Sequence, residues 1–398
     1  MIQMSSSRSS EISSKSDSSS VIYDHEPFDT FRLRVLKLAQ DLWVGSSPSD
    51  ITIERMAGGG FNRIIGLSKA IDGQEKDQYI LRVPRFEAAQ VDHEVAMLQF
   101  LRRYSTLPVP EIIRFDETND NILGNPYMVQ NRIPGHDLYS LFPKLDHEGK
   151  CRIAKELGHV FHEMLSLHSR DAGVLVLSPD NKSLQAPLWV AQFTKTDKPM
   201  CPYSDEPTVQ STYNMLVSTF KDRRTAALER CSTDVLRSEL LDKFITMAAE
   251  LEKDSWLGSN QNSLCHLDLA PRNILVHYAP DAPLPTISGI LDWDSAVFGP
   301  CFMSCAPPLW VWAWNDDEDE DERTANHDPP TTELRQLKQL FEKAAGADYV
   351  RFAYETPYRL ARRLVHYAIH DIRSKEDVDE SKAMLQEWEE FRRLQPKA

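Results

Sequence analysis

The sequence predicts an α+β protein in which a small antiparallel sheet comes first and a larger, mainly helical part follows. Between Ile51 and Ile133, short apolar runs alternate with turn residues, which is typical of strands and hairpins. Beyond Pro134-Gly135, apolar residues recur instead at the three- and four-residue spacing of helices. This change of periodicity predicts a small sheet-based lobe over residues 23–133 and a helical lobe over residues 134–398.

The start of the chain differs from both lobes. Residues 1–22 are dominated by serine and carry few apolar side chains to bury, so we expect a disordered tail there. Apolar positions at helix spacing between Pro27 and Val44 predict the first helix.

Composition limits the classes of function. The chain has 398 residues and a formal net charge of −15, which argues against the basic face of a nucleic-acid-binding protein. No apolar run is long enough to span a bilayer, and the N-terminus lacks the continuous apolar core of a secretory signal. The six cysteines are scattered and form no C-x-x-C pair, which is typical of reduced thiols. We therefore expect a cytoplasmic protein without nucleic-acid or membrane partners, whose oligomeric state the sequence does not indicate.

Three consecutive glycines, Gly58, Gly59 and Gly60, lie between two strand-like segments. The segment Ile51–Ile53 runs into them, and Ile64–Leu67 follows. Glycines at such a place let backbone N–H groups approach phosphate oxygens without a side chain in the way. The alternative is that they only form the turn of a hairpin.

The strongest chemical signal is an H-x-D-x-x-x-x-N pattern formed by His266, Asp268 and Asn273, followed by Asp292. Apolar runs after Asn273 and before Asp292 place the first three residues on a loop and Asp292 at a strand end. In phosphoryl transfer, one carboxylate orients the acceptor hydroxyl and takes its proton, while an amide oxygen and a second carboxylate hold Mg²⁺ against the nucleotide phosphates. The alternative is an ordinary polar loop in which Asp and Asn serve as turn residues.

Several segments of the chain resemble the aminoglycoside phosphotransferase family. HLDLAPRNILV, which starts at His266, stands where that family has HGDLHPGNILV, and ILDWDSAVFGP, which starts at Ile290, resembles its IDWE-type segment. The glycine cluster with Asn62 resembles the family's GGxxN loop, and NPYMVQNRIPG, which starts at Asn125, resembles its hinge. The resemblance implies a two-lobed, protein-kinase-like fold with a small N-lobe, a large helical C-lobe and ATP·Mg²⁺ between them.

The resemblance also implies roles for the acidic and amide residues of the loop. Asp268 would orient the acceptor hydroxyl and accept its proton. Asn273 and Asp292 would hold Mg²⁺.

Further residues would bind the nucleotide. The Gly58–Gly60 loop and Arg82 would meet the phosphates, although protein kinases have a lysine at the position of Arg82. Glu94 would hold Arg82 in place, or it is an exposed carboxylate on a helix. Met128 would lie in the hinge beside the adenine, or it is a plain core residue.

These assignments predict an ATP-dependent phosphotransferase that moves the γ-phosphoryl group of ATP to a hydroxyl of a small molecule. A protein kinase is disfavoured because Asp292 is followed by Trp293-Asp294 rather than Phe-Gly, and Ala306-Pro307-Pro308 lacks the glutamate of A-P-E. The alternative is a catalytically silent nucleotide-binding pseudokinase or scaffold. Two residues favour this alternative. Arg82 replaces the lysine of protein kinases, and Ser304 stands where the family usually has an aspartate.

For the rest of the C-lobe, residue types and apolar spacing predict secondary structure but no chemical role. Residues 178–207 are rich in Pro, Asp, Ser and Thr and predict an irregular segment, with helices over Val209–Leu228 and Val235–Leu251 after it. By resemblance, this insertion builds much of the acceptor pocket. The tryptophans Trp310, Trp312 and Trp314 either line an acceptor cleft or pack in the core, and residues 316–322 form an acidic, solvated loop. Three helices close the chain, at Leu334–Ala345, Pro357–Ser374 and Asp379–Leu394.

Overall fold

The computed structural model describes residues 26–56, 61–71, 74–85, 91–178, 188–192, 211–230, 235–258, 262–278, 284–314 and 322–395. Four of the features named above fall wholly or mostly outside these residues. They are the serine-rich tail, the glycines Gly58–Gly60, most of the irregular segment 178–207, and the acidic run up to residue 321.

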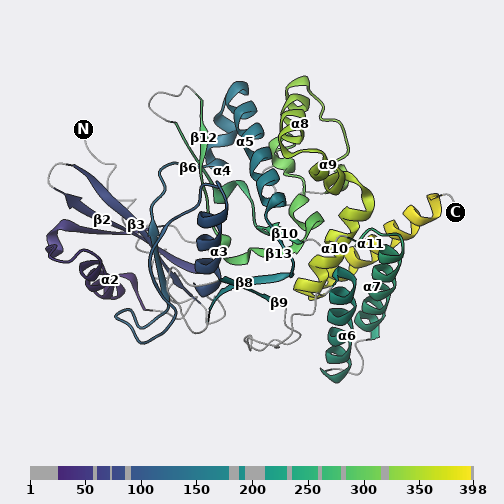
Figure 1. The fold of residues 1–398 in the computed structure, drawn as a ribbon, viewed down its shortest axis with the longest axis horizontal. Helices are drawn as coiled ribbons and strands as arrows, with labels where there is room; N and C mark the ends of the chain where they lie inside the picture. Colours follow the sequence, from purple (N-terminus) through teal and green to yellow (C-terminus); the bar gives the residue numbers. More distant parts are fainter. Residues whose placement is uncertain are drawn as a thin grey trace, which may run out of the picture.

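The N-lobe is built on a five-stranded antiparallel sheet in the order β1-β2-β3-β5-β4 (Figure 1). Its strands are β1 (Ile51–Arg55), β2 (Asn62–Ile71), β3 (Gln74–Pro84), β4 (Ile112–Asp116) and β5 (Tyr127–Asn131). The helix α2 (Phe28–Leu42) packs against this sheet with an apolar stripe made of Phe31, Val35, Leu38 and Ala39. The stripe follows the i, i+4, i+7, i+8 spacing of one helix face, which is why an amphipathic segment can cover a sheet here.

The helix α3 (Val91–Tyr104) follows the sheet strand β3 but packs mainly toward the C-lobe. It is buried almost all round, including the polar residues Glu94 and Gln99. Its apolar residues belong to the large core of the C-lobe, and it contacts the C-lobe strand β8 (Gly173–Leu177). The lobe boundary at residue 134 stays a prediction, because the C-lobe core extends to residues before it: on β5, Met128 belongs to the C-lobe core and Val129 to the N-lobe core.

The C-lobe contains two small antiparallel sheets. One has the order β7-β10-β13-β8-β9 and the other the order β12-β11-β6. Besides β8, their strands are β6 (His136–Asp137), β7 (His168–Ser169), β9 (Leu188–Gln192), β10 (Asn262–Cys265), β11 (Ile274–His277), β12 (Thr286–Ile290) and β13 (Val297–Pro300). The segments with chemical signals all lie where these short strands begin and end.

Helices form the bulk of the C-lobe, and most of them lie on the side of its sheets away from the N-lobe (Figure 1). They are α4 (Leu138–Leu141), α5 (His147–Ser166), α6 (Thr212–Arg230), α7 (Val235–Lys253), α8 (Thr332–Ala345), α9 (Ala347–Tyr354), α10 (Thr356–His370) and α11 (Lys375–Leu394). Short 3₁₀ turns lie at η1 (Pro48–Asp50), η2 (Phe142–Lys144), η3 (Pro271–Asn273), η4 (Trp293–Ser295), η5 (Cys301–Cys305), η6 (Leu309–Val311) and η7 (Glu322–Thr324). The predicted α+β architecture, with a sheet-based first part and a helical second part, is confirmed.

Some elements differ from the sequence-based prediction. Residues 188–192 were expected to be irregular but form β9, which pairs with β8. The strand β10 was not expected, because its polar residues Asn262 and Ser263 are buried and the strand lacks alternation. The Asn262 side chain is satisfied by donating to the Arg170 carbonyl at 3.1 Å. Whether these residues form strands therefore depends on their pairing with other strands, which the local sequence does not indicate.

The last two helices have different ends from those predicted. α10 stops at His370 because Asp371 adopts a left-handed backbone conformation with φ 68°. α11 starts at Lys375 because Ser374 and Asp377 form a capping box, in which each side chain accepts from the other's backbone N–H.

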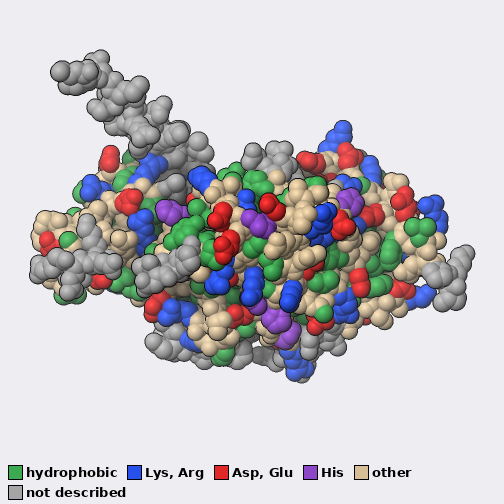
Figure 2. Space-filling view, turned by 90° about the horizontal axis from the view of Figure 1, so that it is seen from above, with side chains coloured by type: hydrophobic (Ala, Val, Ile, Leu, Met, Phe, Trp, Pro, Cys, Tyr) green, Lys and Arg blue, Asp and Glu red, His purple; other side chains and the backbone are tan. Residues whose placement is uncertain are grey.

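Two observations bear on the expected partners. In the parts of the chain that the structure describes, no helix is long and apolar enough to cross a membrane. On the face seen in Figure 2, acidic and basic side chains of the described residues are interspersed.

Candidate active site

The loop between β10 and β11 is held in place by His266. The ring of His266 is 2% exposed; its Nε2 donates to the Leu291 carbonyl at 3.0 Å, and its Nδ1 accepts from the Asp268 N–H at 3.3 Å. Both contacts are satisfied by a neutral ring protonated on Nε2. Burial lowers the pKa of His266, which favours this neutral form. The histidine thus joins the loop to the end of β12 without carrying charge.

Asp268 presents its carboxylate to a pocket while both of its oxygens are engaged. Arg272 Nη2 lies 2.6 Å from Oδ1, and Asn273 Nδ2 donates to Oδ2 at 3.0 Å. The same Asn273 amide donates to the Asp268 carbonyl at 2.9 Å. The side chain of Asp268 is still 38% exposed, so its carboxylate is both oriented and accessible.

The two predicted metal ligands belong to neighbouring backbone segments. The Leu291 N–H donates to the Asn273 carbonyl at 2.8 Å, so Asp292 follows directly after the residue that is tied to the loop. Asp292 has φ 67° and ψ 57°, a left-handed conformation that ends β12 and turns the chain into η4. Its side chain is 36% exposed, whereas Asn273 is buried.

The residues present fit Mg²⁺ better than a metal held by protein alone. Among the described residues, no group of three or more His, Cys, Asp or Glu could hold a metal ion. Magnesium usually takes one or two carboxylates and completes its shell with water and substrate phosphates. Asp292 with the amide oxygen of Asn273 matches that incomplete donor set.

Arg82 of β3 connects the N-lobe to this region. Its Nη2 lies 2.6 Å from Asp292 Oδ1, 3.2 Å from Glu94 Oε2 and 3.9 Å from Asp294 Oδ2. Burial alone would lower the pKa of Arg82, but Glu94 and Asp292 outweigh it and raise that pKa, so the guanidinium stays charged. Burial raises the pKa of Glu94 to about 7, against the opposing effect of Arg82. The Nε atom of Arg82 is buried and has no hydrogen-bond partner among the described residues.

The structure says less about the other residues that were predicted to contact the nucleotide. Met128 is 1% exposed, pairs with Arg82 in the register of β3 and β5, and belongs to the C-lobe core. Its contact with the adenine stays a prediction. Gly58–Gly60 lie outside the described residues.

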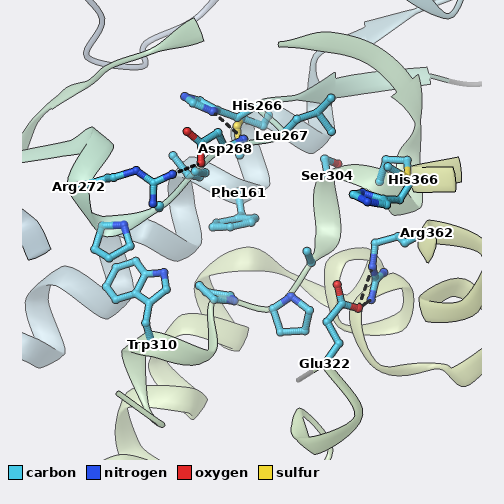
Figure 3. Close-up of a pocket in the computed structure, with 18 of the residues that line it drawn as sticks. Phe161, His266, Leu267, Asp268, Arg272, Ser304, Trp310, Glu322, Arg362 and His366 are labelled. Atoms are coloured by element: carbon cyan, nitrogen blue, oxygen red, sulfur yellow. Dashed lines mark hydrogen bonds and ion pairs between the residues drawn. The ribbon is translucent and has the colours of Figure 1, made fainter. Parts of the chain in front are cut away.

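A pocket of about 460 Å³ opens beside Asp268 (Figure 3). Asp268, Arg272 and Trp310 lie on one side of it, and Glu322 and Arg362 lie on the other. Both alternatives for the tryptophans are realised: Trp310 and Trp314 line the pocket, whereas Trp312 is 2% exposed and packs against Phe341.

Ser304 also lines the pocket, and its hydroxyl is engaged within the C-lobe. It donates to the Cys301 carbonyl at 3.0 Å and lies 3.0 Å from the hydroxyl oxygen of Ser263. These contacts link η5 to β10. The loop at Asp292 is held instead by the contacts of Leu291 with Asn273 and His266 and by the ion pair of Asp292 with Arg82.

Sequence reasoning did not assign two residues of the site. His266 was part of the motif but received no role, and Arg272 was not singled out, although it stands where the family segment HGDLHPGNILV has a glycine. The available signal for Arg272 was its distance of four residues from Asp268, which on a tight turn brings the two side chains together.

The match to a known family covers most of the site. The model of a phosphotransferase enzyme family, APH, matches residues 68–340, which is more than half of the chain and includes Asp268, Asn273 and Asp292. The chain belongs to this family. Together with the sheet order of the two lobes, membership of the APH family confirms the protein-kinase-like fold class and the resemblance from which it was predicted.

Individual proteins similar to this APH family member include two curated relatives. These are subtelomeric hrmA-associated cluster proteins of two Aspergillus fumigatus strains, each 36% identical over 92 residues. The match covers 22% of this chain and 17% of the length of each relative.

Similar solved structures include two aminoglycoside phosphotransferases. The GDP complex of wild-type aminoglycoside 2′-phosphotransferase-IIIa has a TM-score of 0.47 at 16% identity, over 90% of this chain and 99% of that one. Aminoglycoside phosphotransferase APH(4)-Ia has a TM-score of 0.47 at 14% identity, over 89% of this chain and 98% of that one.

Proposed function

We propose that this protein is an ATP- and Mg²⁺-dependent phosphotransferase that moves the γ-phosphoryl group of ATP to a hydroxyl of a small molecule. The observation that carries the proposal is the Asp268 carboxylate, which is held at both oxygens and yet opens into a pocket of small-molecule size. A scaffold has no chemical need for a carboxylate held in this way. The scattered cysteines, of which the four described are free thiols, support a cytoplasmic location.

In this proposal, Asp268 acts on the acceptor hydroxyl, and the other residues of the site act on the phosphate donor, ATP. Asp268 accepts a hydrogen bond from the acceptor hydroxyl and takes its proton as the oxygen attacks phosphorus. Asn273 and Asp292 would hold Mg²⁺, which would neutralise charge on the phosphate oxygens. Arg82 of β3 would contact the phosphates, and Glu94 holds it in place at 3.2 Å. Most of the rate enhancement comes from positioning and charge neutralisation, because no covalent intermediate is needed.

A catalytically silent nucleotide-binding protein is the second candidate. It is favoured by one specific contact, since Arg82 lies 2.6 Å from Asp292 and occupies the carboxylate that would bind Mg²⁺. Thermal-shift titration with ATP and Mg²⁺ separates the two candidates. Stabilisation without phosphate transfer to any compound of a broad hydroxyl panel would favour the silent protein.

The direct test is the Asp268→Asn variant assayed for ATP-dependent phosphorylation of hydroxyl-bearing metabolites and aminoglycosides. The amide keeps the shape but cannot take the proton, so we expect kcat to fall by about 10²- to 10⁴-fold. ATP binding, measured by the Mg²⁺·ATP-induced thermal shift, should stay close to that of the parent. Asp254→Asn changes an exposed aspartate on the turn after α7 and serves as the matched control. Full activity in Asp268→Asn would reject the proposal.

A further inference from the structure

The pocket beside Asp268 has one wall made of aromatic rings that support each other. Trp314 stacks on Phe142 with ring centroids 5.7 Å apart and meets Trp310 edge to face at 6.4 Å. Tyr139 lies 5.6 Å from Trp314, and Trp310 meets Phe142 edge to face at 5.4 Å. Mutual packing of this kind holds the rings of Trp310 and Trp314 in place before any ligand binds.

The wall is brought to the catalytic loop by the short helix α4. Asp137 caps α4 by accepting from the Ser140 N–H at 2.8 Å, and α4 packs against η3, which contains Arg272 and Asn273. Tyr139 of α4 and Asp268 therefore line one pocket, although they are far apart in the sequence. A ring lying on this wall has a carboxylate within the same cavity to receive its hydroxyl group.

Each acidic or basic side chain of the described lining has a partner of opposite charge. Asp268 is bound to Arg272 at 2.6 Å, and Glu322 is bound to Arg362 at 2.8 Å. The third arginine of the lining, Arg363, pairs with Glu380, which is not part of the lining, at 3.5 Å.

The two histidines of the described lining, His266 and His366, add no positive charge to the pocket. Desolvation lowers the pKa of both His266 and His366, so both rings are neutral at pH 7. The described lining therefore offers no carboxylate without a cationic partner.

A ligand with several ammonium groups would meet this lining at a cost. Each ammonium would need a carboxylate, and taking Glu322 would leave Arg362 buried without its counter-charge. Removing one partner of a buried ion pair is strongly unfavourable because the other charge stays desolvated. An uncharged ring leaves both pairs intact and gains apolar contact with the aromatic wall.

We infer that the acceptor is an uncharged alcohol or phenol with a flat ring, which lies on the wall of Tyr139, Trp310 and Trp314 and points its hydroxyl at Asp268. This inference rests on the proposed function. The hydroxyl proton passes to Asp268 as the acceptor oxygen forms its bond to the γ-phosphorus of ATP. The bond from that phosphorus to the β–γ bridging oxygen breaks, and ADP leaves with the electron pair.

The experiment compares three probes in the full-length protein with Mg²⁺·ATP. They are 4-hydroxybenzyl alcohol as the uncharged flat ring, glucose as an uncharged acceptor without an aromatic ring, and the polycation kanamycin. Phosphorylated product is quantified by mass spectrometry. We expect 4-hydroxybenzyl alcohol to have the highest kcat/KM of the three, by about tenfold or more.

Variants of Trp314 test whether the preference for a flat ring depends on the aromatic wall. Trp314→Ala should raise KM for 4-hydroxybenzyl alcohol about tenfold and leave kcat within about threefold, because ring contact is present in both ground and transition states. Trp314→Phe should restore KM to within about threefold of the parent. Trp256→Phe, which changes a tryptophan outside the pocket, should leave KM unchanged.

Binding is followed separately by tryptophan fluorescence, so that the inference is tested without turnover. The parent should show saturable quenching by 4-hydroxybenzyl alcohol that is lost in Trp314→Ala and kept in Trp256→Phe. Equal or better turnover of kanamycin or glucose, or quenching that does not depend on Trp314, would overturn the inference and leave the proposed function standing. No thermal shift with Mg²⁺·ATP and no phosphorylated product would overturn the proposed function instead, and the quenching experiment would still decide whether the ring binds.

Discussion

At the scale of single residues, Arg272 is the side chain that most directly controls Asp268. It contacts Oδ1 while Asn273 contacts Oδ2, so the carboxylate is held from two sides. Arg272 is 48% exposed, and an ion pair that exposed adds little to the stability of the fold. Its effect should therefore appear in catalysis.

The Arg272→Gln variant tests this role. We expect kcat to fall by about tenfold, because a freely rotating carboxylate spends less time in the productive orientation. The unfolding free energy should change by less than about 1 kcal/mol. Steady-state kinetics and urea unfolding measure the two quantities.

Arg152→Gln is the matched control for Arg272→Gln. Arg152 and Glu156 form an i,i+4 ion pair of the same 2.6 Å length on α5, and Arg152 is 44% exposed. An equal loss of activity in both variants would show that the effect is not specific to Asp268.

His266 predicts a pH dependence of stability. Because burial lowers its pKa in the folded state, the unfolded chain binds the proton more readily once the pH falls below about 6.5. Stability is therefore present above that pH and is lost as the pH falls below it. In His266→Gln, the unfolding free energy should decline less steeply between pH 7 and pH 5 than in the parent.

Urea unfolding at several pH values measures this difference. His159 is exposed on α5, and His159→Gln should keep the pH slope of the parent. The same slope in His266→Gln and the parent would contradict the neutral, buried state of this ring.

At the scale of elements, the contact between α5 and α8 supports the pocket, because α5 carries the lining residues Phe161 and Met164. Gly158 of α5 lies against the backbone of α8. A Cβ atom at this position would come within 2.5 Å of the Phe341 carbonyl oxygen and 2.7 Å of Ala344 Cβ. The two helices can approach this closely only because position 158 has no side chain.

Gly158→Ala should therefore destabilise the protein, although alanine is the better helix former by about 1 kcal/mol. We expect a loss of about 2 kcal/mol or more in unfolding free energy, measured by urea denaturation. Gly149→Ala is the control on the same helix, where an added Cβ meets only side-chain atoms, at 3.1 Å or more. A stabilised Gly158→Ala variant would show that the two helices can move apart without cost.

At the scale of the whole molecule, Arg82 joins the two lobes. It lies on β3 of the N-lobe sheet, and it contacts Glu94 on α3 and Asp292 beyond β12. Three carboxylates, counting Asp294, surround a single buried cation. Without that cation they would repel one another in a poorly solvated place.

Arg82→Met should lower the unfolding free energy by about 3 kcal/mol and abolish the thermal shift caused by Mg²⁺·ATP. Arg82→Lys keeps the charge but loses the planar fork, so it should retain part of both properties. Arg102→Met is the control, since Arg102 and Glu111 form an exposed ion pair of 3.3 Å whose removal should cost less than about 1 kcal/mol. An unchanged thermal shift in Arg82→Met would remove Arg82 from the nucleotide site.

Much of the fold could be predicted from local pattern. The strands β2 and β3 and the helices α5, α7 and α8 have periodicities that do not depend on distant partners. The strands β10 and β13 could not be predicted, because they contain Asn262 and Gly299-Pro300, residue types depleted in strands, and they form through pairing with each other. The helix α9 was missed for a similar reason, since eight residues are too few for a periodic signal.

The sequence by itself determined the fold class, the family and the order of Asp268, Asn273 and Asp292, because spacing along one loop and one strand is a local property. Only the tertiary structure decided which charges face them. Arg82 and Asp292 are 210 residues apart, and Trp314 and Tyr139 come from different parts of the C-lobe. Such pairs are brought together by the packing of lobes and helices, and the character of the acceptor pocket depends on that packing.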